Sequence, residues 1–140
     1  MIELLVNIDV DDLDRAVAFY TCAFGFEIGR RFVESAAVEL VGGSSRVYLL
    51  SKAAGTVSSP GYDLKRDYRR HWTPVHLDVV VDDIDASVRR AVAAGAAMES
   101  KIETHSWGKL ALMADPFGHG LCLLQFIGRG YDEISERSRH

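Results

Sequence analysis

Long apolar runs and a surplus of positive charge are both missing from this sequence of 140 residues. No apolar run approaches the roughly 18 residues that a membrane-spanning helix needs, and the N-terminal MIELLVNIDVDD has no basic region followed by an apolar one. Lysine and arginine number 16 against 20 acidic residues, so the formal net charge is -4. A nucleic-acid binder needs a dominant basic face to neutralise phosphates. We therefore expect a cytoplasmic protein with no nucleic-acid or membrane partner.

Cysteine is scarce as well. The two cysteines, Cys22 and Cys122, form no Cys-x-x-Cys pair. In a reducing compartment such thiols stay free, so we expect no structural disulfide, zinc knuckle or redox pair. A chain of this length buries about 70% of its unfolded surface. It therefore needs neither a metal nor a disulfide in order to fold.

What the sequence does contain is an internal repeat. Residues 6–17, VNIDVDDLDRAV, reappear at residues 77–88 as LDVVVDDIDASV. Each copy reads as an alternating strand, two aspartates, an amphipathic helix and then a glycine, Gly25 or Gly95. One of the aspartates can accept a backbone N–H at the helix start, and the glycine ends the helix. The chain is therefore expected to consist of two halves of one design.

Three more strands are expected after the helix of each half. They are residues 26–33, 36–41 and 46–51 in the first half and residues 97–104, 109–114 and 121–126 in the second. Each half is then a βαβββ module, and the fold class is α+β. We expect a single domain over residues 1–127, and the boundaries of its parts are about 2–52 for the first module, 53–73 for a linker and about 74–127 for the second module. Residues 128–140 read as a polar C-terminal tail without fixed structure.

Helical spacing predicts which side of the first helix faces the core. An apolar stripe at i, i+4, i+7 and i+11 is expected to be buried. Its members are Leu13, Val17, Tyr20 and Phe24. Cys22 lies on the opposite side of the wheel and should be exposed.

Two further motifs accompany the repeat. FYTCAFGFE ends the first helix, and WGKLALMADPFGHGLCLLQ runs through the end of the second half. Together with the two βαβββ modules they resemble the vicinal oxygen chelate (VOC) superfamily, which contains glyoxalase I, extradiol dioxygenases and the fosfomycin- and bleomycin-resistance proteins. The resemblance covers about residues 2–127. It implies a curved mixed-sheet cup that holds the ligand, with the helices outside it.

The resemblance also points to a metal position, because metal-dependent members hold a divalent ion with imidazole and carboxylate ligands from the first and last strands of each half. The repeat puts the four corresponding positions at Leu5, Tyr48, His76 and Cys122. Only His76 is a usual ligand, and Cys122 stands where the family pattern carries a glutamate. We therefore expect no metal and no other cofactor. A rearranged site that uses His76 with Cys122, His105 or His119 stays open.

Strand alternation assigns the side chains around this position to one face or the other. Val6, Ile8 and Val10 should pack under the helices, whereas Asn7 and Asp9 should face the cup. The residues expected to bind a ligand are Asn7, Tyr48, Leu50, Trp72, Asp78, Trp107, Met113, Phe117 and Cys122. Aromatic and apolar walls with a few polar groups suit a flat, conjugated small molecule.

Two functions stay open at this point. The first is a metal-independent binding protein of the glyoxalase/bleomycin-resistance type, which sequesters an aromatic or antibiotic-like ligand. The second is a VOC-type enzyme, glyoxalase-like or dioxygenase-like, that uses His76 as its base with Asp78, Tyr48 or Glu39 nearby, or as part of a rearranged metal site. His76 and Asp78 are ~7 Å apart along a strand, which is long for a direct hydrogen bond.

The linker and the oligomeric state can also be predicted from the sequence. The basic segment KRDYRRHW, residues 65–72, could close over an anionic ligand, but a charged linker is more commonly just solvated. The resemblance implies a homodimer, in which the cup forms between the first half of one chain and the second half of the other. Two-fold dimers are the commonest soluble oligomers.

Overall fold

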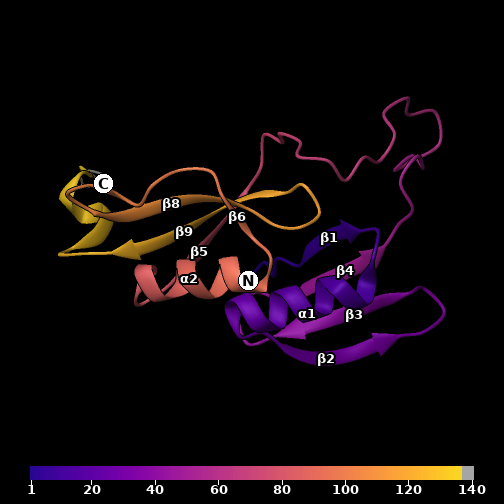
Figure 1. Ribbon diagram of the computed structural model, residues 1–140, viewed down its shortest axis with the longest axis horizontal. Helices are drawn as coiled ribbons and strands as arrows, with labels where there is room; N and C mark the ends of the chain where they lie inside the picture. Colours follow the sequence, from indigo (N-terminus) through magenta and orange to yellow (C-terminus); the bar gives the residue numbers. More distant parts are fainter. Residues whose placement is uncertain (137–140) are drawn as a thin grey trace.

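Two modules of the same order make up the computed structural model, which describes residues 1–136 (Figure 1). The first module consists of β1 (Val6–Val10), α1 (Leu13–Phe24), β2 (Glu27–Phe32), β3 (Ala37–Val41) and β4 (Val47–Ser51). The second consists of β5 (Leu77–Val80), α2 (Ile84–Ala94), β6 (Ala97–Met98), β7 (Glu103–Thr104), β8 (Gly108–Ala114) and β9 (Gly120–Phe126). The α+β class and the paired βαβββ modules are therefore confirmed.

Each module builds its own mixed sheet. The strand order is β1-β4-β3-β2 in the first sheet and β5-β9-β8-β6 in the second, where β7 also pairs with β8. In both sheets the first strand of the module is parallel to the last one, β1 to β4 and β5 to β9. This pairing makes Asn7 a direct neighbour of Tyr48, and Asp78 a direct neighbour of Cys122.

The single strand predicted over residues 97–104 is wrong, because the segment divides into β6 and β7. Between these strands the Ser100 hydroxyl accepts a hydrogen bond from the backbone N–H of Leu112 at 3.0 Å. A serine side chain that bonds the backbone competes with the regular ladder. The interruption therefore follows from the serine.

Both helices begin at the predicted aspartates. Asp12 accepts the backbone N–H of Arg15 at 3.0 Å, and Asp83 accepts that of Ala86 at 3.1 Å. Gly25 ends α1 with a φ of 76°, the left-handed conformation that glycine adopts without strain. None of the helices within residues 1–136 is long and apolar enough to cross a membrane.

The face that α1 buries differs from the predicted stripe. Its buried residues are Ala16, Phe19, Tyr20 and Ala23. Of the predicted stripe only Tyr20 is buried, and Leu13, Val17 and Phe24 are half-buried at the edge of the core. The prediction considered large apolar side chains only. Ala16 and Ala23 are buried instead, because their small side chains let α1 pack closely against its neighbours. Cys22 is exposed, as expected.

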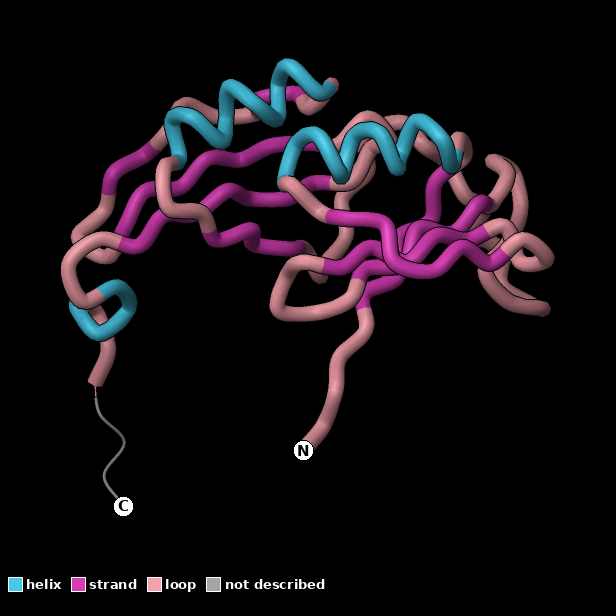
Figure 2. The backbone as a smooth tube through the Cα atoms, turned by 90° about the horizontal axis from the view of Figure 1, so that it is seen from below, coloured by secondary structure: helices cyan, strands magenta, loops and turns pink. Residues whose placement is uncertain are grey.

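The helices cover one side of the sheets and leave the opposite side open (Figure 2). On the covered side Val10 is 0% exposed and Leu49 is 0% exposed, whereas Val80 on the open side is 58% exposed. This matches the predicted alternation. The open side carries the polar residues Asn7, Asp9 and Asp78 and is therefore the side that offers groups to a ligand.

The linker is held against both modules rather than free. Arg66 Nε donates to Asp9 Oδ2 at 2.7 Å, and the backbone N–H of His71 donates to the Gly118 carbonyl at 3.0 Å. A Cβ at Gly118 would lie 2.2 Å from a carbonyl oxygen of the linker, so this close approach requires glycine. The linker therefore has a fixed path.

The tail beyond residue 127 was predicted to lack fixed structure, but its first part is structured. Residues Gly130–Glu133 form a short 3-10 helix. The Tyr131 ring lies 4.8 Å from the ring of Phe126 and 5.3 Å from that of Trp107. An aromatic side chain thus anchors this part of the tail to the second sheet. Residues 137–140 lie outside the described residues.

Candidate functional site

A hollow of about 220 Å³ lies between the open face of the second sheet and the linker. Its walls include Arg70, Trp72, His76, Glu99, Leu112 and Cys122. The linker supplies the first two of these residues, and the rest come from the second module. The hollow therefore depends on the fixed path of the linker as much as on the sheet.

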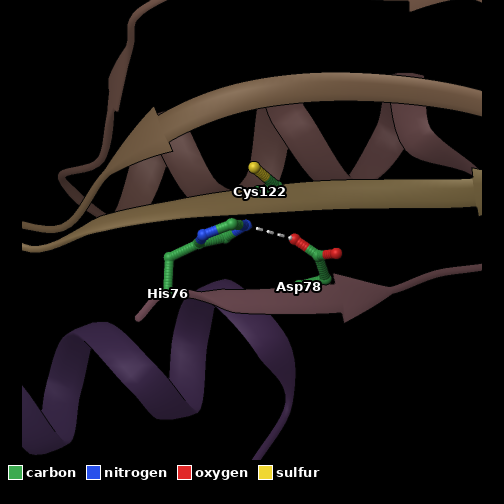
Figure 3. A group of neighbouring side chains, drawn as sticks. All are labelled: His76, Asp78 and Cys122. Atoms are coloured by element: carbon green, nitrogen blue, oxygen red, sulfur yellow. Dashed lines mark ion pairs between the residues drawn. The ribbon is translucent and has the colours of Figure 1, made fainter. Parts of the chain in front are cut away.

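Three potentially reactive side chains lie close together, namely His76, Asp78 and Cys122 (Figure 3). His76 and Cys122 line the hollow, whereas Asp78 lies beside them and does not line it. His76 Nε2 lies 3.1 Å from Asp78 Oδ1, and one ligand atom from each of His76, Asp78 and Cys122 lies within 4.8 Å of the others. The expectation that His76 and Asp78 are too far apart for direct contact is wrong. The strand spacing describes the backbone, whereas the imidazole leans along the strand and closes the distance.

The Cys122 thiol is held in its neutral form. Its side chain is buried, and burial disfavours a thiolate; the charge and hydrogen bonding of Asp78 act in the same direction. Together they raise the pKa of Cys122 to about 11. A neutral thiol is a weak nucleophile and a weak metal ligand.

The four positions at which the resemblance implies a metal do not carry the implied set of imidazole and carboxylate ligands. Leu5 offers no donor atom, and the Tyr48 hydroxyl donates to Glu39 Oε2 at 2.8 Å in the first sheet. Within residues 1–136 the one cluster of three candidate ligands is that of His76, Asp78 and Cys122. All three of its members come from the second half of the chain, and one of them is a neutral thiol.

Neither His105 nor His119 joins this cluster, so the rearranged sites that include them are not formed. His105 Nε2 lies 3.3 Å from Glu103 Oε2, and its ring stacks on Trp107 with centroids 5.1 Å apart. His119 Nδ1 lies 2.8 Å from Asp115 Oδ2. Trp107 packs with His105 and Tyr131 at the end of the sheet and does not line the hollow.

Met113 borders the hollow but is not an open-face residue. It is 1% exposed and belongs to the core on the helix side. Across the β8–β9 pair Leu112 stands opposite Cys122, and Leu112 is 44% exposed. The hairpin register would have revealed this, because it puts even-numbered residues of both strands on one face.

Phe117 was expected to contact a ligand, but the structure buries it. It is 0% exposed and packs in the core, where the Arg15 guanidinium lies 5.6 Å from its ring centroid. The turn that carries it folds inward, so its ring stabilises the protein and is closed to a ligand.

The remaining predicted residues lie on the first sheet. Tyr48 and Leu50 are half-buried there and do not line the 220 Å³ hollow. Asn7 and His76 share a second hollow of about 380 Å³ where the two modules meet. Glu39 was expected near His76, but it is engaged by Arg30 Nη2 at 2.5 Å.

The Arg30 pair explains the acidity of Glu39. Hydrogen bonds from the guanidinium, opposed by burial and aided by the Tyr48 hydroxyl, lower the pKa of Glu39 to about 2. A carboxylate held in this way stays ionised at neutral pH and makes a poor proton acceptor. It is therefore unsuited to act as a base with His76.

Sequence reasoning missed the ion pair between Arg70 and Glu99. Arg70 Nε and Nη2 lie 2.6 and 2.9 Å from the two carboxylate oxygens of Glu99. A Cβ at Gly120 would lie 2.5 Å from the guanidinium, so this glycine leaves the space that Arg70 occupies. The two partners are 29 residues apart in sequence, and no local pattern connects them.

Two βαβββ modules, each with its first and last strands parallel, and a hollow on the open sheet face define a protein of the VOC class. Residues 5–124 match the Glyoxalase-like domain family. The chain therefore belongs to the glyoxalase-like domain family of the VOC superfamily.

Solved structures agree on the fold. A genomically encoded fosfomycin resistance protein from Listeria monocytogenes is similar with a TM-score of 0.69 at 16% identity, covering 91% of this chain and 96% of that one. A glyoxalase/bleomycin resistance protein/dioxygenase from Nocardioides has a TM-score of 0.64 at 18% identity, covering 93% of this chain and 86% of that one.

Curated relatives match over a shorter stretch. Uncharacterized proteins of Mycobacterium bovis and Mycobacterium tuberculosis are 41% identical over 64 residues, which is 44% of this chain. The match spans 42% of the first relative and 38% of the second. The chain thus spans about two fifths of the length of the curated relatives it matches.

Proposed function

We propose that this protein binds a flat, aromatic or antibiotic-like small molecule in the hollow beside His76 and does so without a metal ion. The observation that carries the proposal is the hollow of about 220 Å³, which has Trp72 at its rim, apolar walls and a single usual metal ligand, His76, among the four expected metal positions. Concave sites with apolar walls and a few polar groups are typical of small-molecule binding.

A thermal-shift screen of aromatic antibiotics, aldehydes and thiol conjugates tests the binding function. A ligand that binds the folded state raises the melting temperature by mass action. Trp72→Ala should abolish the shift, whereas Tyr62→Ala, an exposed tyrosine outside the hollow, should leave it unchanged. Hits that are unaffected by Trp72→Ala would argue against this location.

Metal independence is tested separately on protein purified without a histidine tag. After dialysis we expect less than stoichiometric nickel, zinc, iron or manganese, and we expect the thermal shift to survive a chelator. Retention of one ion per chain would refute this part of the proposal and leave the binding function standing.

A second candidate function is an enzyme with His76 as general base. The 3.1 Å contact between His76 Nε2 and Asp78 Oδ1 favours it, because a carboxylate that orients an imidazole leaves the other ring nitrogen free to take a proton. Product analysis of each hit separates the two functions. Unchanged ligand supports sequestration, whereas conversion that is lost in His76→Ala supports catalysis.

We also propose a homodimer. Apolar side chains on the open side, such as Val80 at 58% and Leu112 at 44% exposure, would be covered by the first module of a second copy. Sedimentation at micromolar concentration should give twice the monomer mass. A monomer would contradict the proposal.

A further inference from the structure

We propose that the hollow selects planar cations over planar anions. The inference rests on the proposed binding function and adds the charge class of the ligand. Its basis is the arrangement of the charged groups around the hollow, where the positive charge is cancelled and one negative charge is not.

The positive charge belongs to Arg70, and its guanidinium is fully engaged. Two of its nitrogens contact both oxygens of Glu99, and it also donates to the carbonyls of His71 and Gly118. A two-point pair of this kind fixes the fork of the guanidinium in place. An anionic ligand would have to displace Glu99 before it could use Arg70.

The uncompensated negative charge belongs to Asp78, which does not line the hollow itself but lies directly beside His76 and Cys122, which do. Its side chain is 39% exposed, and its contacts are His76 Nε2 at 3.1 Å and the neutral thiol of Cys122. Neither partner carries a fixed positive charge as the guanidinium of Arg70 does. Among the described residues that line the hollow, Arg70 is the one arginine or lysine. A cation near Asp78 therefore gains attraction, and an anion meets repulsion.

Trp72 adds a surface on which a flat cation can lie. Its side chain is 80% exposed at the rim of the hollow, although large aromatic side chains are usually mostly buried. The electron-rich face of an indole attracts cations more strongly than other aromatic faces do. Stacking on Trp72 and attraction to Asp78 favour the same ligand class.

A matched pair of dyes tests the selection: 9-aminoacridine, a planar cation at pH 7, and acridine-9-carboxylate, a planar anion with the same ring system. Fluorescence titration of the full chain at low salt should give a dissociation constant about 10-fold lower for the cation, which corresponds to about 1.4 kcal/mol. The preference should weaken as salt is added, because Asp78 is partly exposed.

Three variants locate the effect. Asp78→Asn keeps the size of the side chain and should remove most of the preference. Asp85→Asn removes the same charge from an exposed position in the first turn of α2, on the covered side, and should leave the preference intact. Glu99→Gln frees Arg70 and should tighten anion binding several-fold.

The outcomes separate the two levels of the proposal. A tighter anion, or an equal loss of preference in Asp78→Asn and Asp85→Asn, would overturn the charge selection and leave planar-ligand binding standing. If neither dye binds in a saturable, Trp72-dependent way, the binding function itself fails.

Discussion

Tyr20 joins the two modules through a single buried hydrogen bond. Its hydroxyl, on α1, donates to Asp115 Oδ2 at 2.6 Å, and Asp115 follows β8 of the second module. Both residues are buried, at 3% and 5% exposure. The substitution Tyr20→Phe removes this bond and keeps the ring, so it isolates the contribution of the hydroxyl.

The magnitude follows from what Asp115 retains. Three donors stay in place: the backbone N–H groups of Phe117 and His119, both at 2.9 Å, and His119 Nδ1 at 2.8 Å. The carboxylate therefore loses one hydrogen bond and keeps the other three. Hydrogen bonds to charged groups contribute about 1.5–3 kcal/mol, so we expect a loss of about 2 kcal/mol in the free energy of unfolding.

The sign of the pH dependence follows from the pKa of Asp115. Burial acts to raise this pKa, but the hydrogen bond and charge of His119 and the hydrogen bond of Tyr20 lower it overall. A carboxyl group with a lowered folded pKa stabilises the protein above its ordinary pKa of about 3.9, and that contribution is lost as the pH falls through the folded value. The deficit of Tyr20→Phe should therefore be complete at neutral pH and shrink in acid.

Urea unfolding followed by circular dichroism measures the effect. With a slope of about 2 kcal/mol/M, the midpoint should fall by about 1 M. Tyr62→Phe, an exposed tyrosine, is the matched control and should leave the midpoint unchanged. A change of less than about 0.5 kcal/mol in Tyr20→Phe at pH 7 would refute the reasoning, because surface substitutions already vary by that much.

Three further predictions concern single side chains. With a pKa of about 11, the thiolate of Cys122 amounts to about 0.1% at pH 8, so Cys122 should react with iodoacetamide about 100-fold more slowly than free cysteine does, and more slowly than exposed Cys22; equal rates for the two cysteines in peptide mass spectrometry would contradict the burial of Cys122. Phe117→Ala should lower the free energy of unfolding in urea by about 3–5 kcal/mol because it leaves a cavity in the core, and a loss below about 1 kcal/mol would contradict the burial of Phe117. Because Arg30 lowers the pKa of Glu39 to about 2, a carboxyl NMR titration should find Glu39 ionised down to about that pH, whereas a midpoint near 4 would mean that the ion pair is broken in solution.

The amino-acid sequence was sufficient to predict the two modules and the family to which the chain belongs. The repeat at residues 6–17 and 77–88 predicted two βαβββ units, because strand and helix periodicities are local properties of a sequence. The aspartate at the start of each helix was predictable for the same reason. Leu5 and Tyr48 stand where the resemblance implies imidazole or carboxylate ligands, and this too is a matter of residue identity, which folding does not alter.

The details of the hollow were beyond the sequence because they depend on register and on the path of the linker. A shift of one residue along β8 exchanges Met113 for Leu112 on the open face. The inward fold of the Phe117 turn is set by core packing and not by the turn motif itself. Ala16 and Ala23 belong to the buried face of α1 because small side chains let the helix pack closely against its neighbours. A search for a stripe of large apolar residues does not detect this face.

By itself, then, the sequence determined two repeated modules, their caps and membership of the glyoxalase-like family, since all of these are written in residue type and spacing. Folding was needed to bring His76 into contact with Asp78 beside a neutral Cys122, and to pair Glu99 with Arg70. Arg70 and Glu99 come from segments 29 residues apart, and the His76–Asp78 contact depends on how one side chain leans along its strand. A side-chain contact of about 3 Å requires a precision that no periodicity along the chain can supply.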